Sequence, residues 1–546
     1  MGEQVRIGVL CNHFLWEEWE IQVMEQLLRI PGTEFTVVIY PAGKKEAPNF
    51  FSIQKFLHYP YRRLLWNKLR GFWFRSELFS KHDYRSRLGV AHELGVRVQR
   101  ETKNRERIDS EGVASIAALK PDLIIRFGFN ILQGEILTLP RLGVWSFHHA
   151  DPFEIRGGPL GFWEIYFGFR SCAVVLQRLN ETLDKGEVLA YRRFTTSLHS
   201  YQEHAERLIG NSIEMPALVL KGIIGKYWTA PVFEPLPKQV SRLYRIPGNL
   251  KVIVFFIRLF FRRLEFYYNK LFRQEHWTVY LYDGITGQTK QIPDPRIDGY
   301  FADPFFYRDK DGTLHILVEN YVRKHGKGEI ANIHLEPEIS IHHLFDSVIH
   351  RSYPFIVTTP NQDYVVPEQS VAGSVFLRPF NGDADTLSSW EMILSFPGVD
   401  STLVYFQGRW WLWCTRAGIE ADSALYLFYS DNVKGPYLPH AGNPVKFDCA
   451  SSRPAGRPIV LGGKLYRPAQ NCSHTYGGNV VWNCVEVLDP NVYSERPAPS
   501  PQGFPVKGKA AGMHHIDYFE SSFVYDIKSY RFSFISFVNH LKARII

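Results

Sequence analysis

Val5-Arg-Ile-Gly-Val-Leu10 is a short, β-branched run of the kind that lies buried in a parallel sheet. The stretch Trp19-Glu-Ile-Gln-Val-Met-Glu-Gln-Leu-Leu28 follows with the apolar spacing of a helix, and Phe35-Thr-Val-Val-Ile-Tyr40 has the pattern of a second strand. Strand, helix and strand in this order form a βαβ unit, so the chain is predicted to begin with an α/β domain. No Gly-x-Gly-x-x-Gly motif follows the first strand, so a nicotinamide dinucleotide site has no support.

The parallel-sheet pattern resumes further along the chain in three apolar runs: Asp122–Arg126, Gly143–His148 and Ala173–Gln177. Residues 51–110 precede these runs. They are basic and aromatic, and we expect them to form a largely helical insertion. A helical segment from His199 to Lys226 closes the domain. We therefore place the α/β domain at residues 1–232.

From Trp277 onward the sequence changes to short strands separated by Gly, Pro, Asp and Asn. Several strands are paired around a glycine turn, as in Tyr405-Phe-Gln-Gly-Arg-Trp410 and Val460-Leu-Gly-Gly-Lys-Leu-Tyr466. Regular hairpins of this kind are typical of a β-propeller or a β-sandwich. We therefore place an all-β domain at residues 276–546.

Residues 233–275 connect the two domains and contain an unusually apolar helix, residues 250–273. The polar positions of this helix form one narrow stripe: 258, 262, 265, 269 and 273. Its charged residues make a membrane-spanning segment costly: Arg258, Arg262, Arg263 and Glu265. We favour a helix that is buried between the two domains. The second interpretation is a helix that lies flat on a membrane, with its arginines toward the phospholipid head groups.

The composition restricts the class of protein. With 546 residues, 45% of them apolar and 22% charged, the chain is an ordinary globular protein of two or three domains. The net charge of +8 is modest and no Lys/Arg block concentrates it, so it permits contact with phosphate, nucleic acid or an anionic membrane surface without arguing for any of them. We expect no nucleic-acid partner. Six scattered cysteines have no metal-ligand spacing, which indicates reduced thiols and no metal site. No signal peptide is visible at the first residues, so we expect a cytoplasmic protein, with membrane association as the alternative.

Three separated motifs carry the clearest chemistry. Ser146-Phe-His148 follows an apolar strand, Arg156-Gly157 comes shortly downstream, and Leu183-Asp184-Lys-Gly186 lies further on. In order and spacing they resemble the formyltransferase superfamily, whose core is Asn-x-His, Arg-Gly and an Asp in a Leu-Asp-x-Gly turn. The resemblance covers residues 5–200 and implies a Rossmann-like formyltransferase domain. The superfamily includes methionyl-tRNA, glycinamide ribonucleotide and sugar N-formyltransferases.

The resemblance also implies roles for individual residues. His148 is the implied general base, Asp184 orients and charges it, and Ser146 stands where the family has the Asn that stabilises the oxyanion. A serine hydroxyl still donates one hydrogen bond, although losing such a donor typically costs about 10²–10³ in rate. The implied cofactor is N10-formyltetrahydrofolate, in a pocket formed by Phe127, Gly128, Arg156, Gly157 and Gly158.

Acidic residues recur at the starts of strands in the all-β domain, in Phe301-Ala-Asp303-Pro-Phe305, Pro367-Glu368 and Val399-Asp400. Together with Ser452-Arg453-Pro-Ala and Tyr466-Arg467-Pro-Ala, they resemble the N-terminal propeller of the plant glucosamine inositolphosphorylceramide transferases, over residues 275–530. The resemblance implies a five-bladed β-propeller, like that of family-43 glycosidases, with a carbohydrate-binding channel formed by Asp303, Glu368, Asp400, Arg453 and Arg467. Two carboxylates could also hydrolyse a glycosidic bond. In the structural interpretation, Asp303 only accepts hydrogen bonds from a turn.

We therefore hypothesise a multidomain α/β and all-β enzyme that transfers a formyl or other acyl group from N10-formyltetrahydrofolate. The acceptor is an amino sugar or glycan-linked amine, and the propeller binds the carbohydrate. The alternative is a non-catalytic carbohydrate-binding or scaffold protein of glycan assembly with a degenerate formyltransferase domain. In a third hypothesis, Ser146 indicates a different transfer, with another acyl donor or another nucleotide. A role on tRNA is least favoured, because the propeller replaces the small C-terminal domain of those enzymes.

Overall fold

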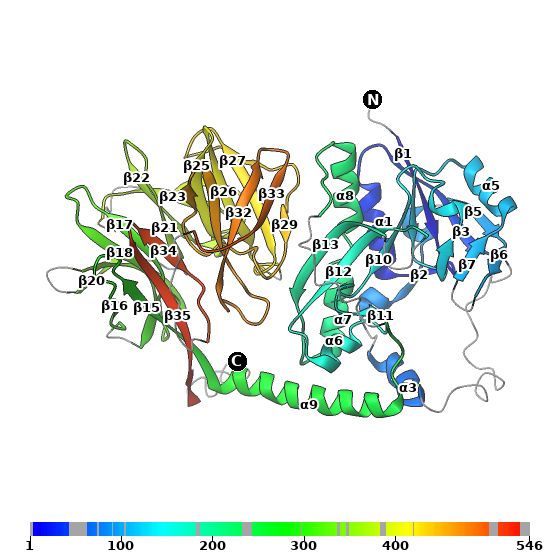
Figure 1. Cartoon of the computed structure of the whole chain (residues 1–546), viewed down its shortest axis with the longest axis horizontal. Coiled ribbons are helices and arrows are strands. Elements are labelled where there is room, and N and C mark those ends of the chain that lie inside the picture. Colours follow the sequence, from blue (N-terminus) through cyan, green and yellow to red (C-terminus); the bar gives the residue numbers. More distant parts are fainter. Residues whose placement is uncertain are drawn as a thin grey trace. The chain divides into compact units, whose positions relative to one another are not determined.

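The computed structural model describes residues 4–42, 63–73, 76–89, 91–102, 105–181, 186–231, 243–295, 298–335, 339–345, 349–382, 389–418, 420–501 and 511–534 (Figure 1). The chain divides into two compact units. The first unit comprises Met1–Arg192 and Thr196–Leu264, and the second comprises Arg193–Thr195 and Glu265–Ile546. The division falls within helix α9 (Asn249–Phe272), after Leu264.

A seven-stranded sheet forms the centre of the first unit. Its strands lie in the order β13 (Glu187–Thr195), β12 (Ser171–Arg178), β10 (Val144–His148), β8 (Leu123–Arg126), β1 (Val5–Leu10), β3 (Thr33–Pro41) and β5 (His92–Val96). The five strands from β10 to β5 are parallel, and β12 runs antiparallel to β10. The carboxyl ends of β8 and β10 therefore lie at the same edge of the sheet, which brings residues 126–130 close to Ser146 and His148.

Helices and short strands complete the first unit (Figure 1). The helices are α1 (Glu18–Leu28), α3 (Leu64–Trp73), η2 (Glu77–Phe79), α4 (Arg85–Leu88), α5 (Ser110–Ala118), η3 (Glu135–Leu137), α6 (Phe162–Phe167), α7 (Tyr201–Gly210) and α8 (Met215–Ile224). The short sheets pair β2 (Leu15–Glu17) with β4 (Lys81–Asp83), β6 (Val98–Arg100) with β7 (Arg105–Ile108) and β9 (Ile131–Gln133), and β11 (Arg156–Gly157) with β14 (Leu243–Tyr244).

The βαβ prediction is confirmed by β1, α1 and β3, and the three later apolar runs are β8, β10 and β12. Residues 51–110 differ from the expected helical insertion. Residues 43–62 lie outside the described part, Leu64–Trp73 is helical, but β4 to β7 are strands. His92–Val96 is extended because it pairs in parallel with β3 as the edge strand of the main sheet. The predicted helix from His199 to Lys226 is two helices, and Pro216 stands in the first turn of the second.

Five antiparallel sheets form the described part of the second unit. One joins β15 (Arg273–Tyr282), β16 (Thr289–Gln291), β34 (Ile516–Phe519) and β35 (Ser522–Phe532), and so pairs the beginning of the unit with its end. The other four follow the chain: β17–β20 (Gly299–Arg308, Leu314–Val322, Lys327–His334, Ser340–Leu344), β21–β24 (Ser352–Val357, Asp363–Glu368, Val375–Phe380, Glu391–Leu394), β25–β29 (Gly398–Phe406, Arg409–Arg416, Ala424–Ser430, Leu438–Pro439, Lys446–Phe447) and β30–β33 (Ile459–Leu461, Lys464–Gln470, Val480–Leu488, Tyr493–Ala498). The helix η4 (Ser370–Ala372) precedes β23.

Helix α9 differs from the favoured expectation that it is buried. Within Asn249–Phe272, which is described throughout, only Val252 and Phe255 are buried. No helix in the described ranges is long and apolar enough to cross a membrane. The six cysteines are all buried and none is in a disulfide.

Candidate functional site

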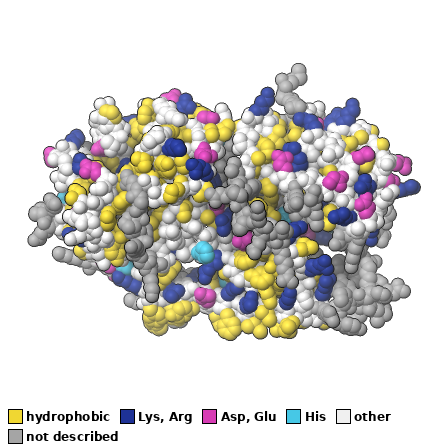
Figure 2. Space-filling view, viewed as in Figure 1, with side chains coloured by type: hydrophobic (Ala, Val, Ile, Leu, Met, Phe, Trp, Pro, Cys, Tyr) yellow, Lys and Arg dark blue, Asp and Glu magenta, His cyan; other side chains and the backbone are white. Residues whose placement is uncertain are grey.

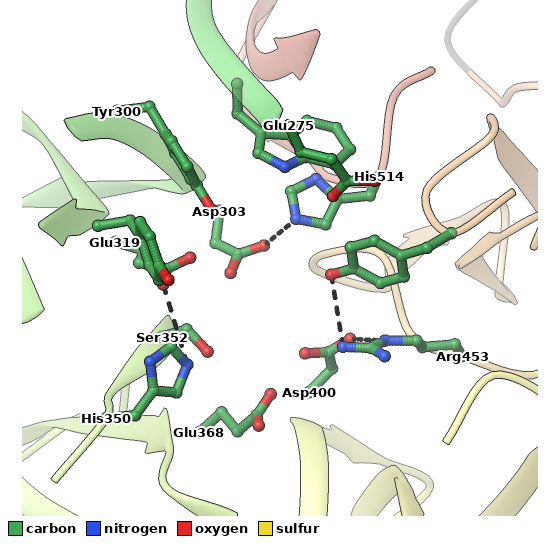
Figure 3. A pocket seen from close by; sticks show the side chains of 13 residues that line it. Glu275, Tyr300, Asp303, Glu319, His350, Ser352, Glu368, Asp400, Arg453 and His514 are labelled. Atoms are coloured by element: carbon green, nitrogen blue, oxygen red, sulfur yellow. Dashed lines mark hydrogen bonds and ion pairs between the residues drawn. The ribbon is translucent and has the colours of Figure 1, made fainter. Parts of the chain in front are cut away.

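Acidic side chains gather in one pocket of the second unit, of about 180 Å³ (Figure 3). Asp303 comes from β17, Glu319 from β18, Glu368 from the end of β22 and Asp400 from β25. Figure 3 shows these carboxylates arranged around a common space, with Arg453 and His514 beside them. The remaining lining residues are mostly aromatic or polar: Glu275, Trp277, Tyr300, Tyr321, His350, Ser352 and Tyr476.

The backbone at three of these strands shares one irregularity. Asp303, Tyr353 and Asp400 have φ angles of +50°, +46° and +52°, which are uncommon for residues with a side chain. Each lies where a strand register shifts: between Ala302 and Phe305, between Ser352 and Phe355, and between Val399 and Thr402. Such bulges and strained positions re-aim side chains and gather at functional sites. The sequence Ala-Asp-Pro at 302–304 is therefore more than an ordinary turn.

Asp303 belongs to a buried chain of charges. Its Oδ1 lies 3.2 Å from Nε2 of His514, whose Nδ1 lies 2.8 Å from Oδ1 of Asp526. Burial opposes the charge on His514, but the two carboxylates outweigh it and raise the pKa of His514 to about 10. Burial likewise opposes the charge on Asp303, yet His514 lowers the pKa of Asp303 to about 2. At neutral pH Asp303 is therefore an ionised hydrogen-bond acceptor.

The pKa values of two other carboxyl groups shift in the opposite direction. Burial, together with Asp303, raises the pKa of Glu319 well above its ordinary value. Burial and the charges of Glu368 and Asp303 raise the pKa of Asp400 to about 7, although Arg453 opposes this with Nε 2.7 Å from Oδ2 of Asp400. The pocket therefore holds one acid whose pKa is lowered beside two whose pKa values are raised, and such divergent environments let the carboxyl groups of one site take different roles.

The structure brings four of the five predicted carbohydrate residues together: Asp303, Glu368, Asp400 and Arg453. Arg467 does not line this pocket. Its guanidinium donates to Glu495 on β33, at 2.6 and 2.9 Å, and to the carbonyl oxygens of Ser451 and Ser452. Buried at 1% exposure, Arg467 is fully engaged in holding the last sheet together.

Sequence reasoning missed Glu319 and Tyr476. Glu319 stands in the strand Leu314-His-Ile-Leu-Val-Glu-Asn-Tyr-Val322 and is buried. An acidic residue within such an apolar run was the sequence signal that could have identified it. Among the described residues, ligand atoms of Asp303, His514 and Asp526 lie within 4.8 Å of one another, close enough for a metal ion. Because both ring nitrogens of His514 already meet carboxylates, a protonated imidazole accounts for this geometry without an ion.

The predicted catalytic residues of the first unit lie at the carboxyl end of β10. Ser146 is buried, and its Oγ accepts a hydrogen bond from Nη1 of Arg126 at 2.7 Å. Nη2 of Arg126 donates to the carbonyl oxygens of Phe129 and Asn130. His148 places Nε2 3.2 Å from the carbonyl oxygen of Ile155. Asp184 lies outside the described residues, so its predicted contact with His148 stays a prediction.

The residues expected to hold a folate lie in tightly constrained backbone. A Cβ on Gly128 would come within 2.6 Å of the backbone nitrogen of Asn12, and one on Gly157, at φ +91°, within 2.2 Å of the carbonyl oxygen of Tyr244. Gly158 faces open space, so a ligand can approach its backbone. The ring of Phe127 packs against Trp19 and Phe147. Arg156 precedes Gly157 in β11, which pairs with β14.

Comparison with known proteins finds similarity in two parts of the chain. Residues 291–522 match the family model "Glucosamine inositolphosphorylceramide transferase 1, N-terminal". The rice protein of that name (Oryza sativa subsp. japonica) is 34% identical over 234 residues, which are 40% of this chain and 31% of the rice protein. This chain thus spans about a third of the length of that curated relative.

A second relative is methionyl-tRNA formyltransferase from Parasynechococcus marenigrum, 35% identical over 117 residues, which are 21% of this chain and 34% of that protein. Among solved structures, an N-formyltransferase from Helicobacter canadensis in complex with folinic acid and dTDP-3-aminofucose aligns with a TM-score of 0.30 and 10% identity, over 60% of this chain and 98% of that one. The chain therefore contains a region that matches the N-terminal part of glucosamine inositolphosphorylceramide transferase and a segment similar in sequence to the formyltransferases.

Proposed function

We propose that this protein is a carbohydrate-related transferase whose second unit binds a sugar in the pocket around Asp303 and Asp400. The observation that carries the proposal is that Asp303 and Glu319 line one buried pocket, where the pKa of Asp303 is lowered to about 2 and the pKa of Glu319 is raised well above its ordinary value. Sugar hydroxyl groups both donate and accept hydrogen bonds, so such a pair recognises them from two sides. Trp277, Tyr300 and Tyr476 supply aromatic rings for the apolar faces of a sugar.

The proposal includes a five-bladed propeller with this pocket near its axis. Two observations support it. Strands β17, β21 and β25, which begin three successive sheets, lie against one another. The pairing of β15 with β35 joins the two ends of the unit, which is how a propeller closes. The side chains at the starts of such strands then point toward one channel.

Binding is favoured over hydrolysis by the environment of Asp400. Its Oδ2 accepts hydrogen bonds from both Arg453 and Gln470, at 2.7 and 3.0 Å. A carboxyl held this way is placed for recognition rather than for giving up a proton to a leaving group. Hydrolysis by two carboxylates stays the second candidate, and an assay for sugar released from a glycoside distinguishes the two.

The test is calorimetric titration of the full chain with glucosamine and with inositol phosphate, the groups that the names of the matched relatives contain. We expect binding that falls at least ~10-fold in Asp303→Asn, which removes the charged acceptor. Asp431→Asn is the matched control, because the Asp431 side chain is 86% exposed and lies outside the pocket. No binding of any sugar from a wider panel would refute the proposal, and release of a free sugar from a glycoside would favour hydrolysis.

For the first unit we propose formyl transfer to an amine of the carbohydrate, at Ser146 and His148. Since Oγ of Ser146 accepts from Arg126, its own proton is free to donate to an oxyanion. His148 would take the proton of the attacking amine. When bound, N10-formyltetrahydrofolate would supply the formyl group, and the open backbone at Gly158, with Phe127, Gly128, Arg156 and Gly157, would hold it. Calorimetry with reduced folate tests this: no binding would favour the scaffold alternative.

A further inference from the structure

Helix α9 presents an apolar surface to solvent along its first sixteen residues, 249–264. We call this surface the outer face, and its members are exposed by 46–74%: Leu250, Ile253, Ile257, Phe260, Phe261 and Leu264. Successive members are three or four residues apart, except for the adjacent Phe260 and Phe261, so they lie on one side of the helix and form one stripe. Figure 2 shows hydrophobic side chains gathered over α9, at the lower edge of the view, with Lys and Arg beside them.

The opposite face of α9 anchors the helix to the first unit. Phe255 stacks on Phe162 with ring centroids 4.5 Å apart, and Val252 is fully buried beside it. Arg258 and Arg262 donate to the carbonyl oxygens of Tyr166 and Ile165, at the end of α6. The predicted polar stripe therefore faces the protein here, because the arginines satisfy the open carbonyls of a helix terminus. This corrects the expectation that these two arginines point toward head groups.

We propose that the outer face of α9 lies on the surface of a membrane that contains anionic phospholipids. Every charged side chain of residues 249–264 is basic. Arg258 and Arg262 bind carbonyl oxygens of α6, whereas Lys251 and Arg263 are exposed and are the cations near the outer face. A row of phenylalanine and aliphatic side chains flanked by cations matches an interface with acyl chains below and anionic head groups above. Docking of a second copy on the same face would instead bring two sets of like charges together.

The extent of the exposed apolar surface supports a membrane as the partner. Soluble monomers rarely leave a contiguous stripe of large apolar side chains exposed, and such stripes mark interaction sites. Phe260 and Phe261, exposed by 59% and 62%, are the two aromatic side chains of the outer face. Lys251 and Arg263 flank the stripe on exposed positions.

The experiment is co-sedimentation of the full chain with phosphatidylcholine vesicles and with vesicles of phosphatidylcholine and phosphatidylserine. We expect at least ~10-fold stronger binding to the phosphatidylserine vesicles, falling with added salt. The variant F260E/F261E should lose at least ~10-fold in binding. Ile285→Glu is the matched control, because Ile285 is 87% exposed but lies far along the chain in the second unit. Circular dichroism confirms that each variant is folded.

Arg263→Glu separates the electrostatic part. It should abolish the preference for phosphatidylserine while leaving residual binding through the apolar stripe. The proposal is overturned if wild type does not sediment with either vesicle, or if F260E/F261E binds as tightly as Ile285→Glu. It is also overturned if analytical ultracentrifugation shows that F260E/F261E converts a dimer to a monomer, because the face would then bind a second copy.

Discussion

Arg453 and Asp400 form a buried ion pair in the pocket, with Nε of the arginine 2.7 Å from Oδ2 of the aspartate. The two side chains are 12% and 4% exposed, and they come from positions fifty-three residues apart. Arg453 also reaches Asp422 at 3.1 Å and lies over the ring of Tyr476. One guanidinium thus sets the positions of two carboxylates and one aromatic ring around the proposed sugar.

Removing this arginine should be costly. Arg453→Met leaves Asp400 buried without its cation, so we expect the free energy of unfolding of the second unit to fall by about 3–5 kcal/mol. The measurement is urea denaturation followed by tryptophan fluorescence. The double variant R453M/D400L removes both charges and should recover most of the loss. A double variant no more stable than Arg453→Met would contradict the pair as the cause.

The dependence of stability on pH should expose His514. Its folded pKa of about 10 lies above the ordinary value of 6.5, so its stabilising effect is complete below pH 6.5 and is lost as pH rises through 10. We expect wild type to lose up to about 1.4 kcal/mol per pH unit over that window through this group. His514→Gln should be less stable at pH 6.5 and lack this slope. Equal slopes in denaturation series from pH 6.5 to 10 would rule the assignment out.

Arg467 offers a contrast with Arg453. Arg467→Met leaves Glu495 with its cationic partner Lys446 alone, and should lower the free energy of unfolding by about 3 kcal/mol or more. Sugar affinity of the folded variant should stay within about 2-fold of wild type, because Arg467 does not line the pocket. Calorimetry at low temperature, where the variant is folded, makes the comparison. A selective loss of affinity would place Arg467 in the site after all.

The comparison of Arg453 with Arg467 also shows what the local sequence cannot predict. Arg453 and Arg467 both stand before Pro-Ala, and both were predicted to bind carbohydrate. They differ because Arg467, on β31, binds Glu495 on β33, beyond the intervening strand β32, whereas Arg453 binds Asp400 in the pocket. Neither partner is near in sequence. The same holds for Arg126, which reaches Ser146 only because β8 and β10 are parallel neighbours.

Elements whose signal is local were predicted well. The continuous apolar runs of β1, β8 and β10 follow from burial on both faces of a parallel sheet, and α9 follows from its stripe. His92-Glu-Leu-Gly-Val96 has no such pattern, and only its pairing with β3 makes it a strand. Asp303 and Asp400 were identified from a resemblance to a known family, whereas the strained bulges on which they stand, at φ +50° and +52°, were not predicted. The face that α9 buries could not be predicted from the sequence of the helix alone, because it is set by contacts with α6.

The substitution Ser146→Asn tests the first unit most directly. An amide at this position can donate to the oxyanion with a longer reach than a hydroxyl. If the domain transfers formyl groups, the variant should do so about 10-fold faster or more, equivalent to about 1.4 kcal/mol of barrier. Because Ser146 is 1% exposed and bonded to Arg126, the larger side chain should also lower the free energy of unfolding by about 1–3 kcal/mol.

Ser146→Ala is the matched control, since it removes the hydroxyl without adding volume and leaves Nη1 of Arg126 without its acceptor. It should lower formyl transfer, so the order of rates is Asn, Ser, Ala. The assay uses N10-formyltetrahydrofolate with a panel of amino-sugar nucleotides, and calorimetry checks folate binding by all three proteins. If the domain uses another acyl donor, Ser146→Asn should reduce the native activity instead, because the amide occupies space that the substrate needs. If none of the three binds reduced folate, the substitutions will change stability alone, and the first unit is a degenerate formyltransferase domain.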